Sequence, residues 1–147
     1  GDGDDVITPG GGSNTVTGGA GTDTFILGSG DGSDPATTFT TITDFEVGEN
    51  GDVLDNTDDD SGTQGLNKVT DAQQAQIDSK STLEAAVDFV ASNYTTNLEW
   101  FFFQYEEETY AVYDKSAGSN YSANDVFVEL TGVVIDDLVD ANTLTTP

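Results

Sequence analysis

The residues best suited to chemistry stand at the start of the chain, where glycines and oxygen-bearing side chains recur at fixed spacing. Residues 1–27 read GDGDDVITP, GGGSNTVTG and GAGTDTFIL, which we call units 1, 2 and 3. Four series of residues share a period of nine: Gly1, Gly10 and Gly19; Gly3, Gly12 and Gly21; Asp5, Asn14 and Asp23; Ile7, Val16 and Phe25. Agreement of four series by chance is improbable, so we interpret this segment as an internal repeat.

Each unit has the composition of a tight turn followed by a short strand. The glycines permit positive φ and a close approach of backbone to backbone, so the turn's carbonyl oxygens can point inward. Three residues then form a strand with one apolar side chain facing in. A flexible Gly/Ser/Asp linker is the alternative. A linker has no reason to keep Ile7, Val16 and Phe25 in register, which favours the folded repeat.

Two units make one coil of a parallel β-roll, so units 1 and 3 should stack on the same edge. Neighbouring strands lie about 4.8 Å apart. A calcium ion with oxygen ligands at about 2.3–2.6 Å on each side spans that gap. Asp5 and Asp23 are therefore expected to share one ion, with loop carbonyls completing the shell. Unit 2 should stack on the opposite edge, against either an upstream unit or the segment after Phe25.

The pattern G-G-x-G-x-D-x-U-x resembles the RTX nonapeptide, a calcium-binding repeat. The stretch GGAGTDTFI at residues 18–26 matches it fully, and unit 1 matches from its second glycine. Unit 2 departs, because Asn14 replaces Asp and its neutral oxygen should bind Ca²⁺ less tightly. The stretches DTFILGSGDGSD, TTITDFEVGENGDVLD, FFFQYEEETYAVYD and NDVFVELTGV are similar to the C-terminal parts of RTX surface proteins, including bacterial S-layer proteins.

The resemblance implies a ligand set, a compartment and a route. The implied metal-binding positions are Gly1, Gly3, Asp5, Gly10, Gly12, Asn14, Gly19, Gly21, Asp23 and, for the terminal calcium, Asp44. Proteins with such repeats are exported by type I secretion systems through an uncleaved C-terminal signal, and the tail from Val133 to Pro147 stands where that signal would lie. The resemblance thus implies an extracellular or cell-surface protein that self-associates in a surface layer or acts as an adhesin.

Composition independently favours a cation as partner. The chain carries 28 acidic residues against three Lys and Arg, a formal net charge of −25. Nucleic-acid binding needs Lys and Arg, so it is excluded as a function class, and an anionic membrane surface would repel the chain. The chain has neither His nor Cys, which excludes a Ser-His-Asp triad, a Cys nucleophile, a disulfide and an ordinary zinc site. No apolar run is long enough to span a bilayer.

The remaining chain is expected to be β-rich with one packed helix. Strands are expected over 39–47, near 52–55, and over 98–105, 109–114 and 125–130, with Glu106–Glu108 as a hairpin turn. The best helix spans 81–91, with Ser81 and Glu84 as a capping box, and a shorter one is possible near 71–77. The fold class is therefore mainly β with minor α: a short roll over 1–55 and a β-rich part over 56–147.

Other acidic and aromatic groups leave alternatives open. Asp31 and Asp34 could add ligands to a calcium site or lie in a solvated turn. Asp52, Asp55 and 58–60 form an acidic patch that we interpret as a solvated face. The loop over 114–124 could hold a cation or simply connect two strands. Four aromatic residues suggest core packing more than a sugar-binding platform: Trp100, Tyr105, Tyr110 and Tyr113.

Three functions fit these observations, and none places a catalytic residue in this chain. The first is a calcium-binding module that folds on binding Ca²⁺ outside the cell, as part of a type I-secreted surface protein. The second is an auxiliary module of a secreted enzyme that binds a polysaccharide, as in alginate epimerases, although a basic groove is lacking. The third is the C-terminal part of a secreted protease or lipase. Asp136 and Asp137 are adjacent, which is the wrong geometry for a glycosidase pair.

Overall fold

The computed structural model describes residues 1–28, 31, 34–48, 50–56, 65–94, 99–115 and 120–135. Within these residues the chain is mostly β, with nine strands in two sheets and two helices. The mainly β class expected from the sequence is confirmed. The acidic residues 58–60, Asp136 and Asp137, and the C-terminal tail beyond 135 lie outside the described residues, as does the middle of the 114–124 loop.

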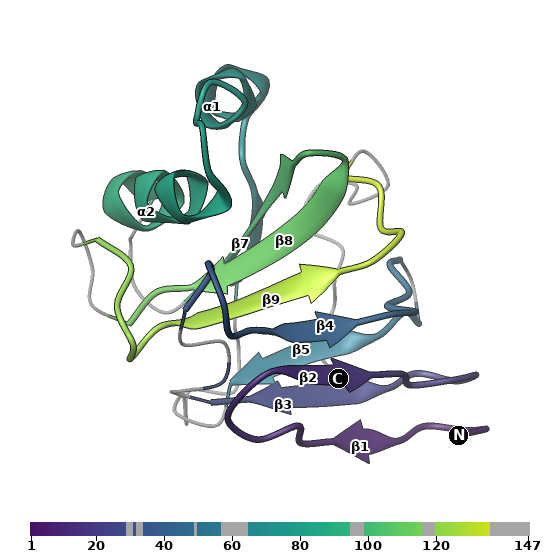
Figure 1. Ribbon diagram of the computed structural model, residues 1–147. Helices are drawn as coiled ribbons and strands as arrows, with labels where there is room; N and C mark the ends of the chain where they lie inside the picture. The colour runs from purple at the N-terminus through teal and green to yellow at the C-terminus, as the bar shows by residue number, and fades with distance from the viewer. Residues whose placement is uncertain are drawn as a thin grey trace.

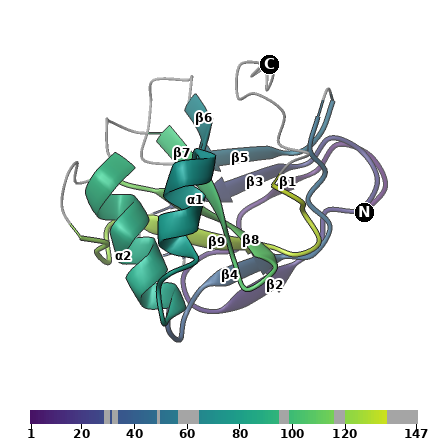
Figure 2. The ribbon, with the colours of Figure 1, turned by 90° about the horizontal axis from the view of Figure 1, so that it is seen from above.

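The N-terminal part alternates between two parallel stacks of short strands. These strands are β1 (Val6–Ile7), β2 (Asn14–Val16), β3 (Thr24–Leu27), β4 (Thr40–Ile42) and β5 (Val53–Asn56). Strands β1, β3 and β5 form a three-stranded parallel sheet, while β2 and β4 pair in parallel in the second sheet. Figure 2 shows the two stacks as separate rows, with the chain crossing between them. Successive strands thus lie on opposite sides of a wound chain. We call residues 1–56, which contain β1 to β5, the coil.

The second sheet continues from the coil into the C-terminal part. Its order is β2-β4-β9-β8-β7-β6, in which the later strands are β6 (Gly65–Lys68), β7 (Glu99–Tyr105), β8 (Glu108–Tyr113) and β9 (Val126–Leu130). Strand β9 pairs in parallel with β4 and antiparallel with β8. Figure 1 shows this continuity, from β2 in the lower part of the view through β4 and β9 to β8. The boundary expected near residue 55 falls at the end of β5, yet one sheet contains strands from both sides of it.

The hairpin between β7 and β8 shows how local sequence sets register. Glu106 and Glu107 both have positive φ, 50° and 75°, the signature of a two-residue type I′ turn that matches strand twist. Glu108 already pairs with Tyr105, so the turn is one residue shorter than the expected Glu106–Glu108. The three expected C-terminal strands are confirmed within two residues at each end. Strand β6 was not expected, because its residues GLNK carry no alternation of apolar and polar side chains.

Both helices pack beside β7, where they cover the sheet (Figures 1 and 2). Helix α1 spans Asp71–Ile77, as expected, and α2 spans Leu83–Tyr94. Thr82, the residue before α2, caps the helix: its hydroxyl accepts a hydrogen bond from the Ala85 amide at 3.2 Å, so the expected cap at Ser81 is wrong by one residue. Its buried stripe includes Val87 and Val90, as the helical spacing predicts.

One hydrophobic cluster joins the two parts of the chain. The coil contributes Phe25, Leu27, Ile42 and Leu54, and the later strands contribute the largest buried rings, among them Trp100, Phe103, Tyr113 and Phe127. The four aromatic residues once considered as a sugar platform are at most 8% exposed. Core packing is therefore confirmed for Trp100, Tyr105, Tyr110 and Tyr113, and an exposed platform built from them is excluded.

Candidate metal centre

Units 1 and 3 lie directly on one another. Val6 pairs with Thr24 and Ile7 with Phe25, a register of two units. The Thr24 amide donates to the Asp5 carbonyl oxygen at 2.8 Å. The turns touch as closely as the strands do, because a Cβ at Gly19 would collide with the carbonyl oxygen of Gly1. Gly19 also has φ of +111°, so both the conformation and the contact require glycine here.

A ladder of carboxylates follows the start of the three stacked strands. The Asp5 amide donates to Oδ1 of Asp23 at 2.9 Å, and the Asp23 amide donates to Oδ1 of Asp52 at 2.8 Å. Asp23 is fully buried and Asp52 is 4% exposed. Each rung is a charge-assisted bond from a backbone N–H, which is stronger than a neutral one. The expected alignment of Asp5 with Asp23 is therefore present, and it extends one strand further than the repeat predicted.

The second oxygen of Asp23 is the most informative atom in this region. Its Oδ2 is buried and has no hydrogen-bond partner among the described residues. A buried carboxylate oxygen without a partner is costly, because its hydration is lost and nothing replaces it. Oδ2 points back toward the start of its own turn, since a Cβ at Gly18 would collide with it. A buried oxygen of this kind calls for a partner outside the protein chain, either an ordered water or an ion.

Oxygens from neighbouring turns also converge where units 1 and 3 meet. The Gly1 nitrogen lies 3.0 Å from Oδ2 of Asp5 and donates a hydrogen bond to the carbonyl oxygen of Gly18, the residue before unit 3. A carboxylate oxygen of unit 1 and a backbone carbonyl beside unit 3 thus lie close to the same atom. Ca²⁺ accepts both kinds of oxygen as ligands.

Unit 2 is built with the same backbone but is closed differently. Gly10 and Gly12 have φ of +75° and +99°, and the equivalent glycines of unit 3, Gly19 and Gly21, also have positive φ, +111° and +135°. Nδ2 of Asn14 donates to the carbonyl oxygen of Gly10 at 2.8 Å and to that of Gly12 at 3.3 Å. Unit 2 pairs in parallel with β4, so the segment after Phe25, one of the two expected partners, stacks on it.

A fourth unit, which the spacing concealed, completes the stack over residues 48–56. Gly48 and Asn50 have φ of +119° and +66°, at the positions of Gly19 and Gly21. Leu54 pairs with Phe25, at the apolar position of the unit. Two features hid it: Asp52 lies 29 residues beyond Asp23, which breaks the period, and Asn replaces a glycine. The remaining signal was the spacing G-x-N-x-D-x-L, because Asn tolerates positive φ better than other residues.

The interpretation of Asp52 as part of a solvated face is wrong. Its two oxygens accept the backbone amides of Asp23 and Glu46, at 2.8 and 2.9 Å. Burial raises the pKa of Asp52 above its ordinary value of 3.8, and the nearby charges of Asp23 and Glu46 raise it further, while the two amide donors lower it. Negative charge is therefore crowded at this edge of the sheet, and burial disfavours the charged form of Asp52.

Asp44 lies beside the glycines that open the turn of unit 3. Its two oxygens accept the amides of Gly18 and Gly19, both at 2.9 Å, so the carboxylate anchors the turn of unit 3 from the side of its N–H groups. Strand β4 spans Thr40–Ile42, so the strand expected over 39–47 is shorter than predicted. A direct role of Asp44 in metal binding stays a prediction.

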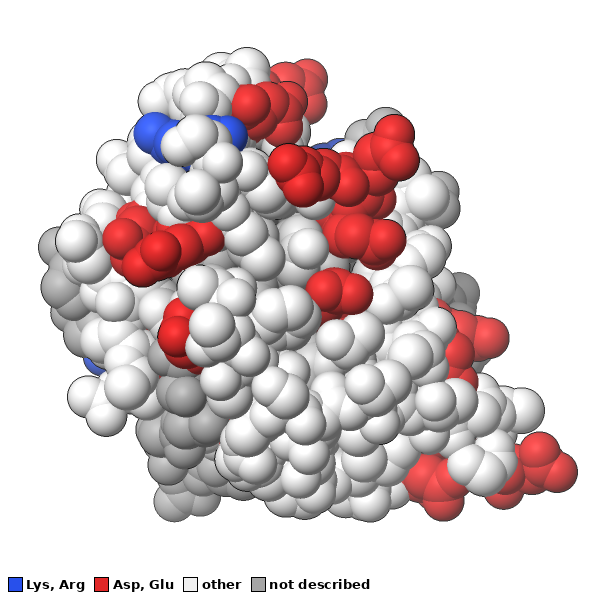
Figure 3. All heavy atoms as spheres, viewed as in Figure 1, with Lys and Arg blue, Asp and Glu red and all other residues white. Residues whose placement is uncertain are grey.

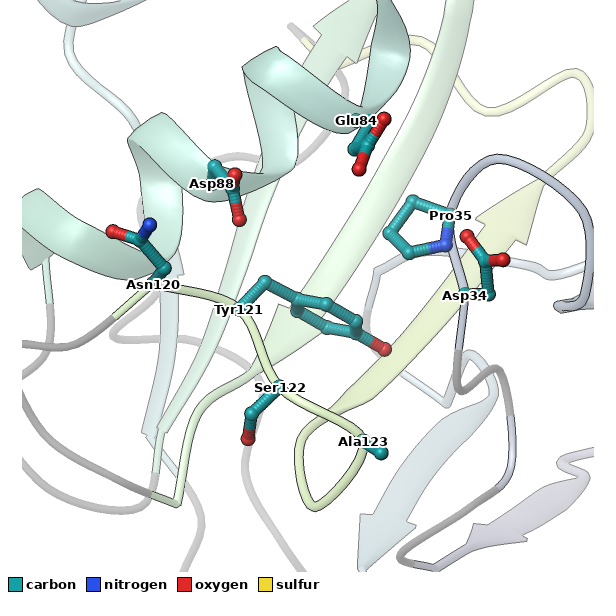
Figure 4. A pocket seen from close by; sticks show the side chains of 8 residues that line it. All are labelled: Asp34, Pro35, Glu84, Asp88, Asn120, Tyr121, Ser122 and Ala123. Carbon is teal, nitrogen blue, oxygen red and sulfur yellow. The ribbon is translucent and has the colours of Figure 1, made fainter.

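A shallow pocket of about 240 Å³ lies where the coil meets α2. Figure 4 shows Glu84 and Asp88 projecting from α2 toward the Tyr121 ring, with Asp34 on the other side. Asp34 is already engaged, because its oxygens accept the Ala36 amide at 2.9 Å and the Thr37 hydroxyl at 2.7 Å. The Thr37 bond, followed by the Ala36 bond, lowers the pKa of Asp34. Asp34 thus closes its own turn, as one of the two alternatives expected, while buried Asp31 accepts the Gly28 amide at 2.8 Å.

The oxygens gathered at units 1 and 3 come from pairs of carboxylates and from turn carbonyls, not from a large carboxylate cluster. Among the described residues, no three or more acidic side chains converge on one point. Acidic side chains instead form several separate groups over the surface, including one at the lower right of Figure 3, where the N-terminal turns lie in Figure 1.

Within the part of the chain that the structure describes, no helix is long and apolar enough to cross a membrane. No protein-family model and no curated protein sequence matches the chain.

Proposed function

We propose that this chain is a calcium-binding module in which a cation ties unit 1 to unit 3. The observation that carries the proposal is the buried Oδ2 of Asp23, an anionic oxygen without a partner among the described residues. Oδ2 of Asp5 and the turn carbonyls of the two units supply further oxygens. Among common cations, Ca²⁺ fits best, because it takes six to eight oxygen ligands and accepts carboxylates and carbonyls in flexible geometry.

The proposed metal would do structural work. Bound Ca²⁺ would neutralise the crowded carboxylates and replace the hydration that Asp23 loses on burial. Metal sites that do not exist in the unfolded chain convert binding free energy into folding free energy. The coil would therefore be loose where calcium is scarce and ordered where it is abundant. Extracellular modules bind Ca²⁺ with dissociation constants on the order of 10⁻⁴ to 10⁻³ M.

The wider role follows from the resemblance to RTX repeats. We propose that the module belongs to a type I-secreted bacterial surface protein, an S-layer protein or adhesin, that stays unfolded during export and folds on reaching external calcium. The stacked units with glycines at positive φ and aspartates in register support this proposal. The alternative of a polysaccharide-binding module is weaker, because the aromatic residues that would form a sugar platform are buried.

Calorimetric titration with Ca²⁺ tests the proposal on two matched variants. Asp23→Ala should lose at least one binding event, because it removes both the Oδ2 ligand and the acceptor of the Asp5 amide. Asp2→Asn is the control: Asp2 is exposed in the turn of unit 1, so the variant also removes one negative charge beside the proposed site and should keep the stoichiometry. Wild-type protein that takes up no calcium at millimolar concentration would refute the proposal.

Hydrogen exchange on the same samples locates the effect. Chelation with EGTA should speed exchange at the amides of residues 1–7 and 19–27 and leave β7, β8 and the helices protected. Exchange that is unchanged in the units, or that changes equally everywhere, would contradict a cation bound between units 1 and 3.

A further inference from the structure

We infer that the Asn14 side-chain amide takes the place of a cation in unit 2, so that this turn closes without metal. Nδ2 of Asn14 donates to the carbonyl oxygens of Gly10 and Gly12, at 2.8 and 3.3 Å. Only the nitrogen of the amide can face two carbonyl oxygens, because the oxygen would repel them. One side chain thus bridges the two inward carbonyls of its own turn.

The equivalent side chain in unit 3 cannot do this. Asp23 stands at the position of Asn14, and Gly19 and Gly21 stand at the positions of Gly10 and Gly12, with positive φ throughout. Its Oδ1 accepts the Asp5 amide, and its Oδ2 is the buried oxygen without a described partner. A carboxylate has no proton to donate to carbonyl oxygens. A turn with Asp therefore needs a cation between these oxygens, and a turn with Asn supplies the positive hydrogen atoms itself.

It follows that the two faces of the coil are stabilised differently, the face of unit 2 by side-chain hydrogen bonds and the face of units 1 and 3 by a cation. The face of unit 2 is fixed without metal: β2 pairs with β4 over three residues, and the Thr43 amide donates to the Val16 carbonyl oxygen at 3.0 Å. Strand β4 in turn pairs with β9 in the large sheet. The inference rests on the proposed function only for the contrast between the faces. The closure of unit 2 by Asn14 stands without it.

Reciprocal isosteric substitutions test the inference, with thermal melts in EGTA and in calcium. Asn14→Asp replaces the bridging donor by a repelling oxygen, so its melting midpoint in EGTA should fall by about 5 °C. Part of that loss should be recovered in calcium. Asp23→Asn keeps Oδ1 for the Asp5 amide and converts Oδ2 into a donor. Its midpoint in EGTA should rise, and its stabilisation by calcium should shrink.

A matched control separates the turn from the charge. Asn124→Asp makes the same chemical change at an exposed position and should leave the midpoint in EGTA unchanged. The inference is overturned if Asn14→Asp melts like the wild-type protein in EGTA, or if the Asn14 side-chain amide protons exchange as fast as those of Asn124. Both readouts are taken without calcium. They therefore stand even if wild-type protein binds none, a result that would refute only the proposed function.

Discussion

The stacked units and the β7–β9 hairpins are joined through the six-stranded sheet, which contains β2 and β4, but they are stabilised by different interactions. In β9 four of the five side chains are buried, and the rings of Tyr110 and Phe127 stack at 5.3 Å. In β1 and β2 none is buried, and Val6 is 69% exposed. Hydrogen bonds to the backbone dominate in the stacked units instead: the carboxylates of Asp23 and Asp52 accept backbone amides, and the Asn14 amide donates to backbone carbonyls. An aromatic core is stabilised by the hydrophobic effect and needs no ligand. Neighbouring buried carboxylates repel one another, so the stability of the ladder depends on what neutralises their charge.

This difference suggests a direction of assembly. The aromatic part provides a finished edge at β9, onto which β4 and then β2 add in parallel. The opposite stack, β5-β3-β1, has no such edge and ends in the carboxylate ladder. A cation would then act last, on a coil that is already half-positioned by its other face. We therefore expect substitutions at the junction between the stacked units and the β7–β9 strands, which we call the aromatic part, to reduce the stability of the molecule most.

The largest effect is expected from Phe127→Ala. Phe127 contacts Tyr110 within the aromatic part and Phe39 from the coil, with ring centroids 5.3 and 5.4 Å apart. Truncating a fully buried Phe leaves a cavity and costs about 3–5 kcal/mol of unfolding free energy. Because Phe127 lies at the junction, both parts should lose stability together in urea denaturation followed by tryptophan fluorescence and far-UV circular dichroism.

Val134→Ala is the control for this measurement. Val134 is 49% exposed, so its truncation should change the unfolding free energy by no more than about 0.5 kcal/mol. Phe127→Ala could instead shift only the tryptophan-fluorescence transition and leave the circular-dichroism transition of the coil in calcium unchanged. The two parts would then be independent, and the proposed direction of assembly would be wrong.

A smaller effect should distinguish two glycines of the repeat. Gly19 and Gly10 both have positive φ, +111° and +75°. Gly10 has open space around its Cα, whereas a Cβ at Gly19 would collide with the Gly1 backbone of the stacked unit. Gly10→Ala should therefore cost about 1–2 kcal/mol from backbone strain alone. Gly19→Ala should cost more and weaken calcium binding, since it separates units 1 and 3. Equal losses from both variants in chemical denaturation would show that the turns are not in contact.

How far the sequence predicts this molecule follows the same division. Strict spacing predicted which residues align: Asp5 with Asp23, and Ile7 with Phe25. Aromatic and β-branched runs predicted the three C-terminal strands, since such residues pack well on a half-buried sheet. In each case the sequence pattern was either local or repeated at a constant spacing, and the strands and alignments that it predicts are present in the structure.

The failures came from contacts whose spacing is irregular. Asp52 joins the ladder after an insertion of variable composition, so neither period nor charge pattern marks it as buried. Strand β6 forms because β7 offers it a partner, and its own residues have little strand character. Asp44 accepts two amides 25 and 26 residues away, a tertiary contact that no local rule contains. Acidic residues in this chain are read correctly only when the backbone groups around them are known.

The smallest effect tests whether carboxylate crowding is confined to the coil. Glu129 lies on β9, paired with both Tyr110 and Thr41. Burial raises its pKa; the Thr131 hydroxyl, at 3.3 Å, lowers it, and the charge of Glu108 raises it again. A carboxyl with a raised pKa favours folding when protonated, so its contribution is present at low pH and is lost as pH rises through the folded-state pKa.

Glu129→Gln keeps the shape and removes the charge. The variant should be more stable than the wild-type protein at pH 7, by less than about 1 kcal/mol because solvent screens a partly exposed group. The advantage should shrink toward pH 4, where the wild-type carboxyl gains its proton. Denaturation of both proteins at the same calcium concentration cancels the pH dependence of metal binding from the difference. A stability difference that does not change with pH would mean that Glu129 carries no electrostatic cost. Destabilisation by crowded carboxylates would then be confined to the coil, where a bound cation is proposed to offset it.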